Sequence, residues 1–358
     1  MDKMTVIRMI VAFLMSGVLS FILSPIAKRT AYKIGAIDVP KDDRRMHKEP
    51  IPRLGGLAVF FAFLVAVIFL VPINRELQGV LLGSVIIVVL GIIDDSISLP
   101  AMVKFVVQII AALVVVFHGI RIDVLSNVNV FSDTSYISIG NWGVPVTVFW
   151  IVAITNAVNL IDGLDGLSVG VCTIASISLL VISALLSEFT IVVIMAALTG
   201  ACIGFLPYNM NPAKMFVGDT GATFLGFILA TISIQGTFKT YAILSFAVPF
   251  LILGLPIFDT AFAIVRRLLH GQSPMHPDRG HVHHRLIDMG FSQKQTVLIL
   301  YLISGILGVS AVLLTSSGAV RALFFIAAFI IALGIGGRIY STFIKRNDER
   351  RKNDESKK

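Results

Sequence analysis

Residues 144–186 read VPVTVFWIVAITNAVNLIDGLDGLSVGVCTIASISLLVISALL. Two apolar runs, Val144–Ile161 and Leu167–Leu186, flank a short motif that carries the two charged residues of this stretch, Asp162 and Asp165. Each run approaches the roughly 20 apolar residues that a helix needs to cross a hydrocarbon core of about 30 Å. The stretch therefore predicts two membrane-spanning helices joined by a polar turn.

The same pattern recurs along the whole chain and predicts eleven apolar helices. The third, fourth and eighth runs are short, so we expect their helices to extend into flanking polar residues. Uniformly apolar runs exclude the alternating pattern of a membrane β-barrel. The first run is too long for a secretory signal and no cleavage site follows it. The runs are Thr5–Ile26, Leu54–Val71, Gly79–Ile93, Val103–Phe117, Val144–Ile161, Leu167–Leu186, Phe189–Leu206, Gly221–Ile234, Tyr241–Phe258, Thr296–Thr315 and Ala319–Ile339.

Composition supports the same fold class. Of the 358 residues 56% are hydrophobic and 14% are charged, whereas a soluble domain has about 25% charged residues. Water-soluble enzymes, coiled coils and disordered chains are therefore excluded. We predict an all-α polytopic membrane protein with one integral membrane domain, residues 1–344, and a charged disordered tail, residues 345–358.

The cysteines and the net charge exclude several kinds of site and ligand. Cys172 and Cys202 both lie in apolar runs, which excludes a disulfide framework and a cysteine zinc site. The formal charge of +8 indicates membrane topology and anionic ligands rather than nucleic acid.

Basic residues predict the orientation. Eleven helices place the termini on opposite sides, and a cytoplasmic C-terminus puts most of the 29 lysines and arginines on the cytoplasmic side. The N-terminus is then outside. Residues 120–140 form part of a long outside loop whose alternating segments predict a small β-hairpin.

Under this orientation six carboxylates at helix ends all face the cytoplasm. A single acid at a helix end often marks only the point where a chain enters water. Six on one side, flanked by basic loops, indicate a site for a hard cation and phosphates. They are Asp94, Asp95, Asp162, Asp165, Asp219 and Asp259.

Three of these positions suggest more specific chemistry. Asp94 and Asp95 repel each other, so one needs a cation or a proton, which suits a metal site or a general base. Lys104 begins the next helix on the same face, where a lysine also serves as an interfacial anchor. Asp219 lies in a Gly-Asp-x-Gly turn at a helix start, where a carboxylate is favoured as an N-cap.

The densest motif is Asn156-Ala-Val-Asn159-Leu-Ile-Asp162-Gly-Leu-Asp165-Gly. Asn156, Asn159 and Asp162 are spaced i, i+3 and i+6, so they share one stripe of a helix. The stripe faces either a ligand or the amide groups of a neighbouring helix.

Two basic loops complete this face, one around Arg53 and one over residues 276–285. The second holds a histidine cluster, a composition that suggests zinc. The adjacent arginines disfavour a cation and instead favour a phosphate or sugar-nucleotide pocket. Its candidate residues are Arg279, His281, His283, His284 and Arg285.

The ninth run contains Pro249, Gly254 and Pro256, which predict a kink because prolines remove helix hydrogen bonds. We expect this helix to end at Asp259 and to offer a groove to an apolar lipid tail.

Together these motifs resemble the polyprenyl-phosphate N-acetylhexosamine-1-phosphate transferase family, of the glycosyltransferase family 4 type, over nearly the whole chain. The matching features are Pro-x-Arg-x-Gly-Gly, Asp94–Asp95, Asn-x-x-Asn-x-x-Asp-Gly-x-Asp-Gly, Phe-x-Gly-Asp-x-Gly and His-x-His-His. The resemblance implies transfer of a sugar 1-phosphate from a UDP-sugar to a polyprenyl phosphate in the bacterial plasma membrane. Ile51-Pro52-Arg53-Leu54-Gly55-Gly56 is similar to the UDP-GlcNAc branch, which includes the initiators of wall teichoic acid synthesis, rather than to the UDP-MurNAc-pentapeptide branch.

The resemblance also implies roles for individual residues. Asp219 and Asn159 would bind Mg²⁺, with Mn²⁺ as a substitute. Asp94 and Asp95 would orient or deprotonate undecaprenyl phosphate, and Lys104 would contact the diphosphate. The nucleotide-sugar would be bound by Arg53, Asn156, Arg279, His281, His283, His284 and Arg285. Asp162 and Asp165 would also contact this substrate, on its uridine side, or would order the glycine turn.

Other functions stay open at this point. A cation-coupled transporter would carry intramembrane carboxylates near the midplane of the bilayer, and a scaffolding protein would not gather them on one face. Within the family, a UDP-MurNAc-pentapeptide transferase is the alternative. The sequence leaves open whether the chain forms a homodimer.

Overall fold

The computed structural model describes residues 1–40, 49–126, 136–237, 247–272 and 280–316, together with positions 327 and 331. Most of the expected eleventh helix, the charged tail and Arg279 lie outside these residues.

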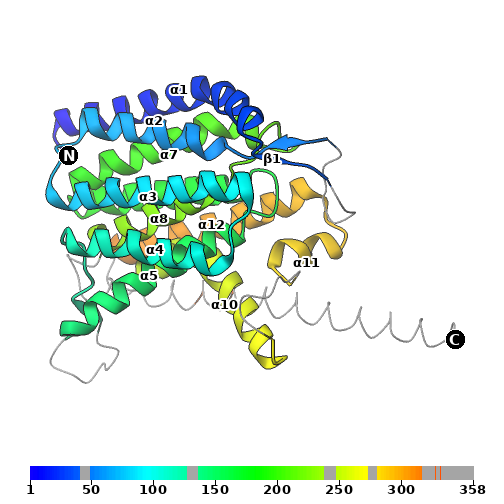
Figure 1. The fold of residues 1–358 in the computed structure, drawn as a ribbon. Coiled ribbons are helices and arrows are strands. Elements are labelled where there is room, and N and C mark those ends of the chain that lie inside the picture. Colours follow the sequence, from blue (N-terminus) through cyan, green and yellow to red (C-terminus); the bar gives the residue numbers. More distant parts are fainter. Residues whose placement is uncertain are drawn as a thin grey trace, which may run out of the picture.

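The described part is a bundle of helices with two small hairpins (Figure 1). The elements are α1 (Lys3–Ile34), β1 (Ile37–Asp38), β2 (Ile51–Pro52), α2 (Gly55–Leu70), α3 (Arg75–Ile97), α4 (Ala101–Phe117), β3 (Val124–Ser126), β4 (Tyr136–Ser138), a 3₁₀ turn η1 (Gly140–Trp142), α5 (Gly143–Leu160), α6 (Leu167–Leu185), α7 (Phe189–Asn209), α8 (Gly218–Thr237), α9 (Ala247–Ile252), α10 (Gly254–Leu269), α11 (Val282–Asp288) and α12 (Gln293–Ser316).

Six helices in the described ranges are long and apolar enough to cross a membrane: α1, α3, the η1–α5 unit, α6, α7 and α12. The shorter helices α2 and α4 are also apolar. The chain is thus a mostly helical, multi-pass membrane protein, as its composition predicts. The third and eighth runs do extend into polar flanks, because α3 and α8 reach 23 and 20 residues. The fourth run does not: α4 has 17 residues and extends beyond the predicted run only by the apolar Ala101 and Met102.

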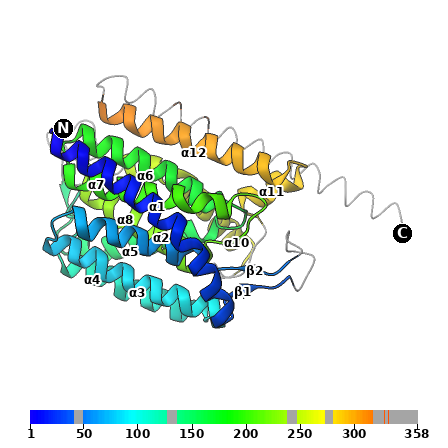
Figure 2. The same cartoon turned by 90° about the horizontal axis from the view of Figure 1, so that it is seen from above.

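Helix α8 forms the centre of the bundle (Figure 2). It packs against α2, α3, α5, α6 and α7, and the side chains between Ala222 and Ile234 are buried. In this buried stretch Thr231 Oγ1 donates to the Phe227 carbonyl of the same helix at 2.9 Å. The charge that α8 carries, Asp219, lies in its first turn, so this helix places one carboxylate at one end of the bundle.

The ninth run differs from its prediction beyond the expected kink. The helix breaks at Leu253, between α9 and α10, and Pro256 lies in the first turn of α10, where a missing N–H costs no helix bond. The helix then continues to Leu269 and leaves the bundle (Figure 1). The expectation that it ends at Asp259 was wrong, because a single charged residue within an otherwise apolar stretch does not end a helix.

Both hairpins lie at the ends of the bundle. Strands β3 and β4 pair antiparallel, with Leu125 opposite Ile137, which confirms the hairpin predicted between residues 120 and 140. Strands β1 and β2 pair Ile37 with Pro52. The sequence did not predict this second hairpin, which lies beside the carboxylates.

Candidate active site

One end of the bundle collects the acidic residues that the sequence places at helix ends. Helices α3 and α5 end there, and α4 and α8 begin there, so their terminal side chains meet. Alternating helix direction produces this arrangement, because each apolar run returns the chain to the opposite end.

A backbone layer holds this end together. Arg53 N donates to the Ala36 carbonyl at 3.0 Å, and Phe216 N donates to the Pro52 carbonyl at 2.9 Å. Gly55 N and Gly56 N donate to the carbonyls of Phe216 and Val217 at 3.0 and 2.8 Å. The loop before α2 and the loop before α8 are thereby joined along their main chains.

Glycines permit this close approach. A Cβ on Gly56 would overlap the backbone of Gly221, and a Cβ on Gly218 would overlap the Arg53 carbonyl. Gly218 also has φ +70°, a left-handed conformation that favours glycine. The Gly-Gly and Gly-Asp-x-Gly motifs therefore have a steric cause that is independent of any ligand.

Asp95 fixes the first turn of α8. Its side chain is fully buried. Its Oδ1 accepts from Asp219 N at 2.9 Å, and its Oδ2 accepts from Thr220 N at 2.9 Å and Thr220 Oγ1 at 2.7 Å. These backbone N–H groups have no partner inside the helix, so Asp95 acts as the N-terminal cap of α8 from another helix.

Asp94 faces a different set of partners. It accepts from Leu99 N at 2.7 Å and pairs with Lys104 Nζ at 2.8 Å. The same Nζ lies 3.3 Å from Asp219 Oδ2. Lys104 therefore joins two of the predicted carboxylates and is more than an interfacial anchor.

Arg53 completes the charged cluster. Its guanidinium lies 3.6 Å from Asp95 Oδ1 and 3.6 Å from Asp219 Oδ1. Burial lowers the pKa of Arg53, but the carboxylates of Asp95 and Asp219 outweigh this effect and raise it. The guanidinium thus stays charged next to these acids.

The two asparagines of the densest motif lie at different depths. Asn159 Nδ2 lies 3.4 Å from Asp219 Oδ2, within the charged cluster. Asn156 Nδ2 instead donates to Gln108 Oε1 at 2.6 Å and to the Val152 carbonyl at 2.8 Å. Asn156 therefore forms the interhelical amide pair that the sequence left as an alternative.

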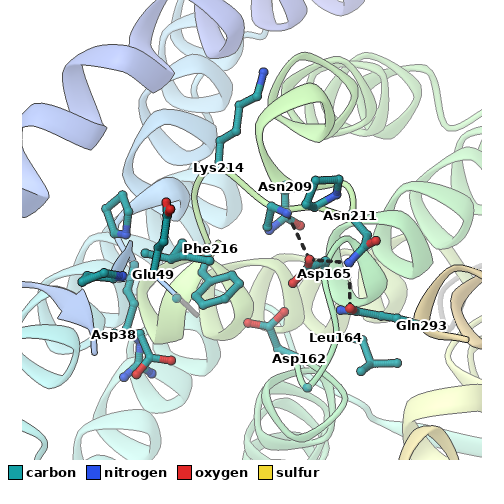
Figure 3. Close-up of a pocket in the computed structure, with 18 of the residues that line it drawn as sticks. Asp38, Glu49, Asp162, Leu164, Asp165, Asn209, Asn211, Lys214, Phe216 and Gln293 are labelled. Carbon is teal, nitrogen blue, oxygen red and sulfur yellow. Dashed lines mark hydrogen bonds between the residues drawn. The ribbon is translucent and has the colours of Figure 1, made fainter. Parts of the chain in front are cut away.

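A cavity of about 940 Å³ opens beside this cluster. Figure 3 shows Phe216 and Asp162 pointing toward each other across it, whereas Lys214 extends away. Arg53 and Gly218 connect the cavity to the charged cluster. The further lining residues come from α1, the β1–β2 hairpin, the α5–α6 turn, the α7–α8 loop, α11 and α12, and include Tyr32, Asp38, Glu49, Asp165, Asn211, His284 and Gln293.

Asp162 and Asp165 share the α5–α6 turn but bond differently. Asp162 accepts from Ser168 Oγ at 2.5 Å, and burial raises its pKa to about 7. Asp165 Oδ2 accepts from Asn211 Nδ2 at 2.9 Å and Ala213 N at 3.0 Å, which anchors the α7–α8 loop (Figure 3).

The histidine loop divides into an anchor and a cavity wall. His284 lines the cavity, and Arg285 lies half-buried on the same helix. His281 is buried and bonds to Asp259. His283 packs on Gly163, where a Cβ would overlap its ring; burial and the neighbouring His284 lower its pKa to about 3 and keep it neutral.

In the described part of the chain, no group of three or more His, Cys, Asp or Glu side chains is placed to hold a metal ion. A cation at this end would therefore have few protein ligands.

Comparison with known proteins identifies the family. The model for glycosyl transferase family 4 matches residues 77–237, which include the carboxylates of α3, the α5–α6 turn and α8. A protein of Bacillus subtilis (strain 168) named "Probable undecaprenyl-phosphate N-acetylglucosaminyl 1-phosphate transferase" is 41% identical over 92% of this chain and 91% of its own length. The chain belongs to glycosyl transferase family 4.

More distant members of glycosyl transferase family 4 also align over most of the chain. "Decaprenyl-phosphate N-acetylglucosaminephosphotransferase" of Mycolicibacterium smegmatis is 34% identical over 83% of this chain and 80% of its own length. "Undecaprenyl-phosphate alpha-N-acetylglucosaminyl 1-phosphate transferase" of Escherichia coli (strain K12) is 27% identical over 87% and 85%.

Sequence reasoning missed several residues of this family-4 site. Phe216 lies in a recognised motif, yet only the cavity shows that its ring forms a wall. Asn211 and Gln293 bond to each other at 2.7 Å beside Asp165. Asp259 was assigned to a helix end, although its partner His281 was named. The carboxylate of Asp259, together with the histidine cluster at residues 281–284, was the sequence signal that could have predicted this pair.

Proposed function

We propose that this protein transfers N-acetylglucosamine 1-phosphate from UDP-GlcNAc to undecaprenyl phosphate and releases UMP, at the cytoplasmic face of the bacterial plasma membrane. The B. subtilis and E. coli relatives, which align with 92% and 87% of this chain, carry names with this activity. The observation that carries the proposal is the charged cluster of Asp94, Lys104, Asp219 and Arg53 beside the cavity of about 940 Å³.

This cluster suits the transfer of a phosphoryl group between two anions. An oxygen of the lipid phosphate bonds to the β-phosphorus of UDP-GlcNAc, and the bond from that phosphorus to the oxygen shared with UMP breaks. Such a reaction requires positioning and charge neutralisation more than covalent help from the protein. Lys104 and Arg53 supply positive charge, and Asp94 orients the lipid phosphate or accepts its proton. Asp95 acts indirectly, because both its oxygens hold α8.

We propose Asp219 and Asn159 as ligands of Mg²⁺, with Mn²⁺ as a substitute. The Asp219 side chain is 19% exposed, and rotation of the Asn159 amide would turn its oxygen toward the same point. Two oxygen donors fit this ion, because Mg²⁺ keeps several waters and takes phosphate oxygens from its substrate. When bound, the ion would neutralise diphosphate charge.

The cavity is our proposed site for the nucleotide-sugar. Its volume lies within the roughly 300–1,000 Å³ of small-molecule pockets. Phe216 offers an aromatic face to a base, and Arg53 and His284 offer donors to phosphate oxygens. Asp162 and Asp165 order the α5–α6 turn through their bonds to Ser168 and Asn211.

Two alternatives receive less support. A cation-coupled transporter requires carboxylates near the bilayer midplane, whereas these acids lie at helix ends. The UDP-MurNAc-pentapeptide alternative is less supported because the three relatives above are named for N-acetylglucosamine. The use of the product in teichoic acid synthesis stays a prediction from resemblance.

The test is UMP release by the purified full-length protein in detergent, given UDP-GlcNAc, undecaprenyl phosphate and Mg²⁺. We expect release to require all three components and to yield a lipid-diphosphate-GlcNAc that mass spectrometry identifies. UMP release without the lipid, or a preference for UDP-MurNAc-pentapeptide, would refute the proposal. Addition of a chelator followed by Mg²⁺ or Mn²⁺ tests the cation.

A further inference from the structure

A buried carboxylate on the projecting helix α10 contacts the start of α11. Asp259 and His281 are each 5% exposed. His281 Nδ1 lies 2.7 Å from Asp259 Oδ2, and Val282 N donates to Asp259 Oδ1 at 2.8 Å. An ionised carboxylate only accepts hydrogen bonds, so Nδ1 carries the proton of this pair.

The same helix binds the loop a second time. Arg266 lies seven residues after Asp259, two helical turns along the same face of α10. A terminal nitrogen of its guanidinium donates to the Gly280 carbonyl at 3.0 Å. Residues 280–282 are therefore held by two polar contacts from one helix face.

Helix α11 depends on such contacts for its place. It has seven residues, and isolated helices this short are not stable in water. Its first backbone N–H groups have no partner within the helix, and its N-cap side chain, His281, makes no capping bond. Asp259 supplies that acceptor from outside.

The position of α11 decides what lines the cavity. The His281 ring stacks on the His283 ring with centroids 5.8 Å apart, and the His283 and His284 centroids are 4.2 Å apart. His283 rests on Gly163 of the α5–α6 turn, and His284 lines the cavity. A contiguous row of side chains thus leads from Asp259 to the cavity wall.

We propose that Asp259 is a positioning residue for the nucleotide-sugar: its bonds to His281 and Val282 hold α11 where His284 faces the cavity. The inference rests on the proposed function, because it assigns the nucleotide-sugar to that cavity. In this proposal His281 anchors the start of α11 to Asp259 of α10. The resemblance instead implies that His281 contacts the substrate directly. Asp259 itself does not line the cavity.

The first experiment compares Asp259→Asn with wild type. The two bonds use different carboxylate oxygens, and asparagine replaces one of these oxygens with an NH₂ donor, so both bonds cannot be kept in their present form. We expect the KM for UDP-GlcNAc to rise about tenfold to a hundredfold, the effect of one lost hydrogen bond to a charged group. The KM for undecaprenyl phosphate should change less than about twofold, and the affinity for UDP-GlcNAc without lipid, measured by calorimetry, should fall in parallel.

The second experiment is a double-mutant cycle with His281→Ala. If Asp259 acts through His281, the effect of Asp259→Asn on the KM for UDP-GlcNAc should shrink at least about threefold in the His281→Ala background. Glu188→Gln is the matched control, since Glu188 lies between α6 and α7, at the end of these helices opposite the α5–α6 turn. It should leave both KM values unchanged.

Three outcomes overturn the inference: an unchanged KM for UDP-GlcNAc, an equal rise for both substrates, or strictly additive effects in the cycle. Thermal unfolding of each variant separates misfolding from misplacement, and an Asp259→Asn protein that unfolds during purification contradicts a purely positioning role. Failure of the proposed function looks different, because the wild type itself would then release no UMP.

Discussion

Asp95→Asn separates a capping role from a catalytic one. The carboxylate accepts three hydrogen bonds from the first turn of α8, at 2.7–2.9 Å, and its side chain is fully buried. Asparagine has nearly the same shape but only one acceptor oxygen. If that oxygen keeps both bonds to Thr220, the amide NH₂ then faces the N–H of Asp219, donor against donor.

The magnitude follows from these contacts. Losing one buried hydrogen bond to a charged group costs about 1.5–3 kcal/mol, and loss of a helix cap typically costs about 1 kcal/mol. These two values describe the loss of the same bond and are not added. We therefore expect the free energy of unfolding to fall by about 2–3 kcal/mol. Asp219 then loses its backbone anchor, and we expect kcat to fall about tenfold to a hundredfold.

The assay combines UMP release with thermal unfolding in detergent. Trp150 provides the signal, because its indole Nε1 donates to Ser233 of α8 at 3.2 Å and so reports on this helix. Asp94→Asn is the comparison: its remaining oxygen can still accept from Leu99 N, so kcat should fall with a smaller loss of stability. If Asp95→Asn lowers kcat and leaves the unfolding temperature unchanged, the capping argument is wrong and a direct chemical role is favoured.

Three other perturbations test the site. Gly56→Ala should lower the unfolding temperature, because its Cβ would overlap Gly221 backbone and overpacking costs about 1–3 kcal/mol; Gly305→Ala, with nothing within 4 Å of its Cβ, is the control and should not lower it. Asp162→Asn should flatten the pH dependence of stability: burial raises the pKa of Asp162 from 3.8 to about 7, so the folded state binds this proton more tightly and wild-type stability falls as pH rises from about 4 to 7. An unaltered unfolding profile across that range would contradict the burial argument. Asp219→Asn should nearly abolish UMP release while the protein stays folded, and near-normal activity at limiting Mg²⁺ would exclude Asp219 as a ligand.

The sequence predicts the position of the site because apolar runs determine which helix ends share a side. Asp94, Asp95 and Asp219 follow or precede such runs, so their presence at the same end of the bundle can be predicted without knowledge of helix packing. The β3–β4 hairpin is likewise local, and its alternating residues predict it. These features depend on contacts near in sequence or on the simple up-and-down path of the chain.

Partner choice could not be predicted in the same way. Asp95 binds Thr220 across 125 positions and Asp259 binds His281 across 22, and nothing in an apolar run states which helices are neighbours. The extent of α10 was missed for another reason. Apolar content detects a membrane environment rather than helical conformation, so Asp259 ended the predicted run but not the helix, which continues to Leu269.

The cap that Asp95 provides has a consequence for biosynthesis. Chains emerge from the N-terminus onward, so α3 enters the membrane long before Gly218–Thr237 has been translated. In that interval Asp95 has no Thr220 to bind, whereas Asp94 has Lys104 available only ten positions later. In a nascent chain shorter than about 220 residues, Asp95 has Arg53 beside it but lacks its three hydrogen-bond donors from α8, and Asp219 is absent. The late arrival of α8 supplies those donors and completes the charged cluster, so we expect a chain that ends before α8 to consume none of the lipid carrier.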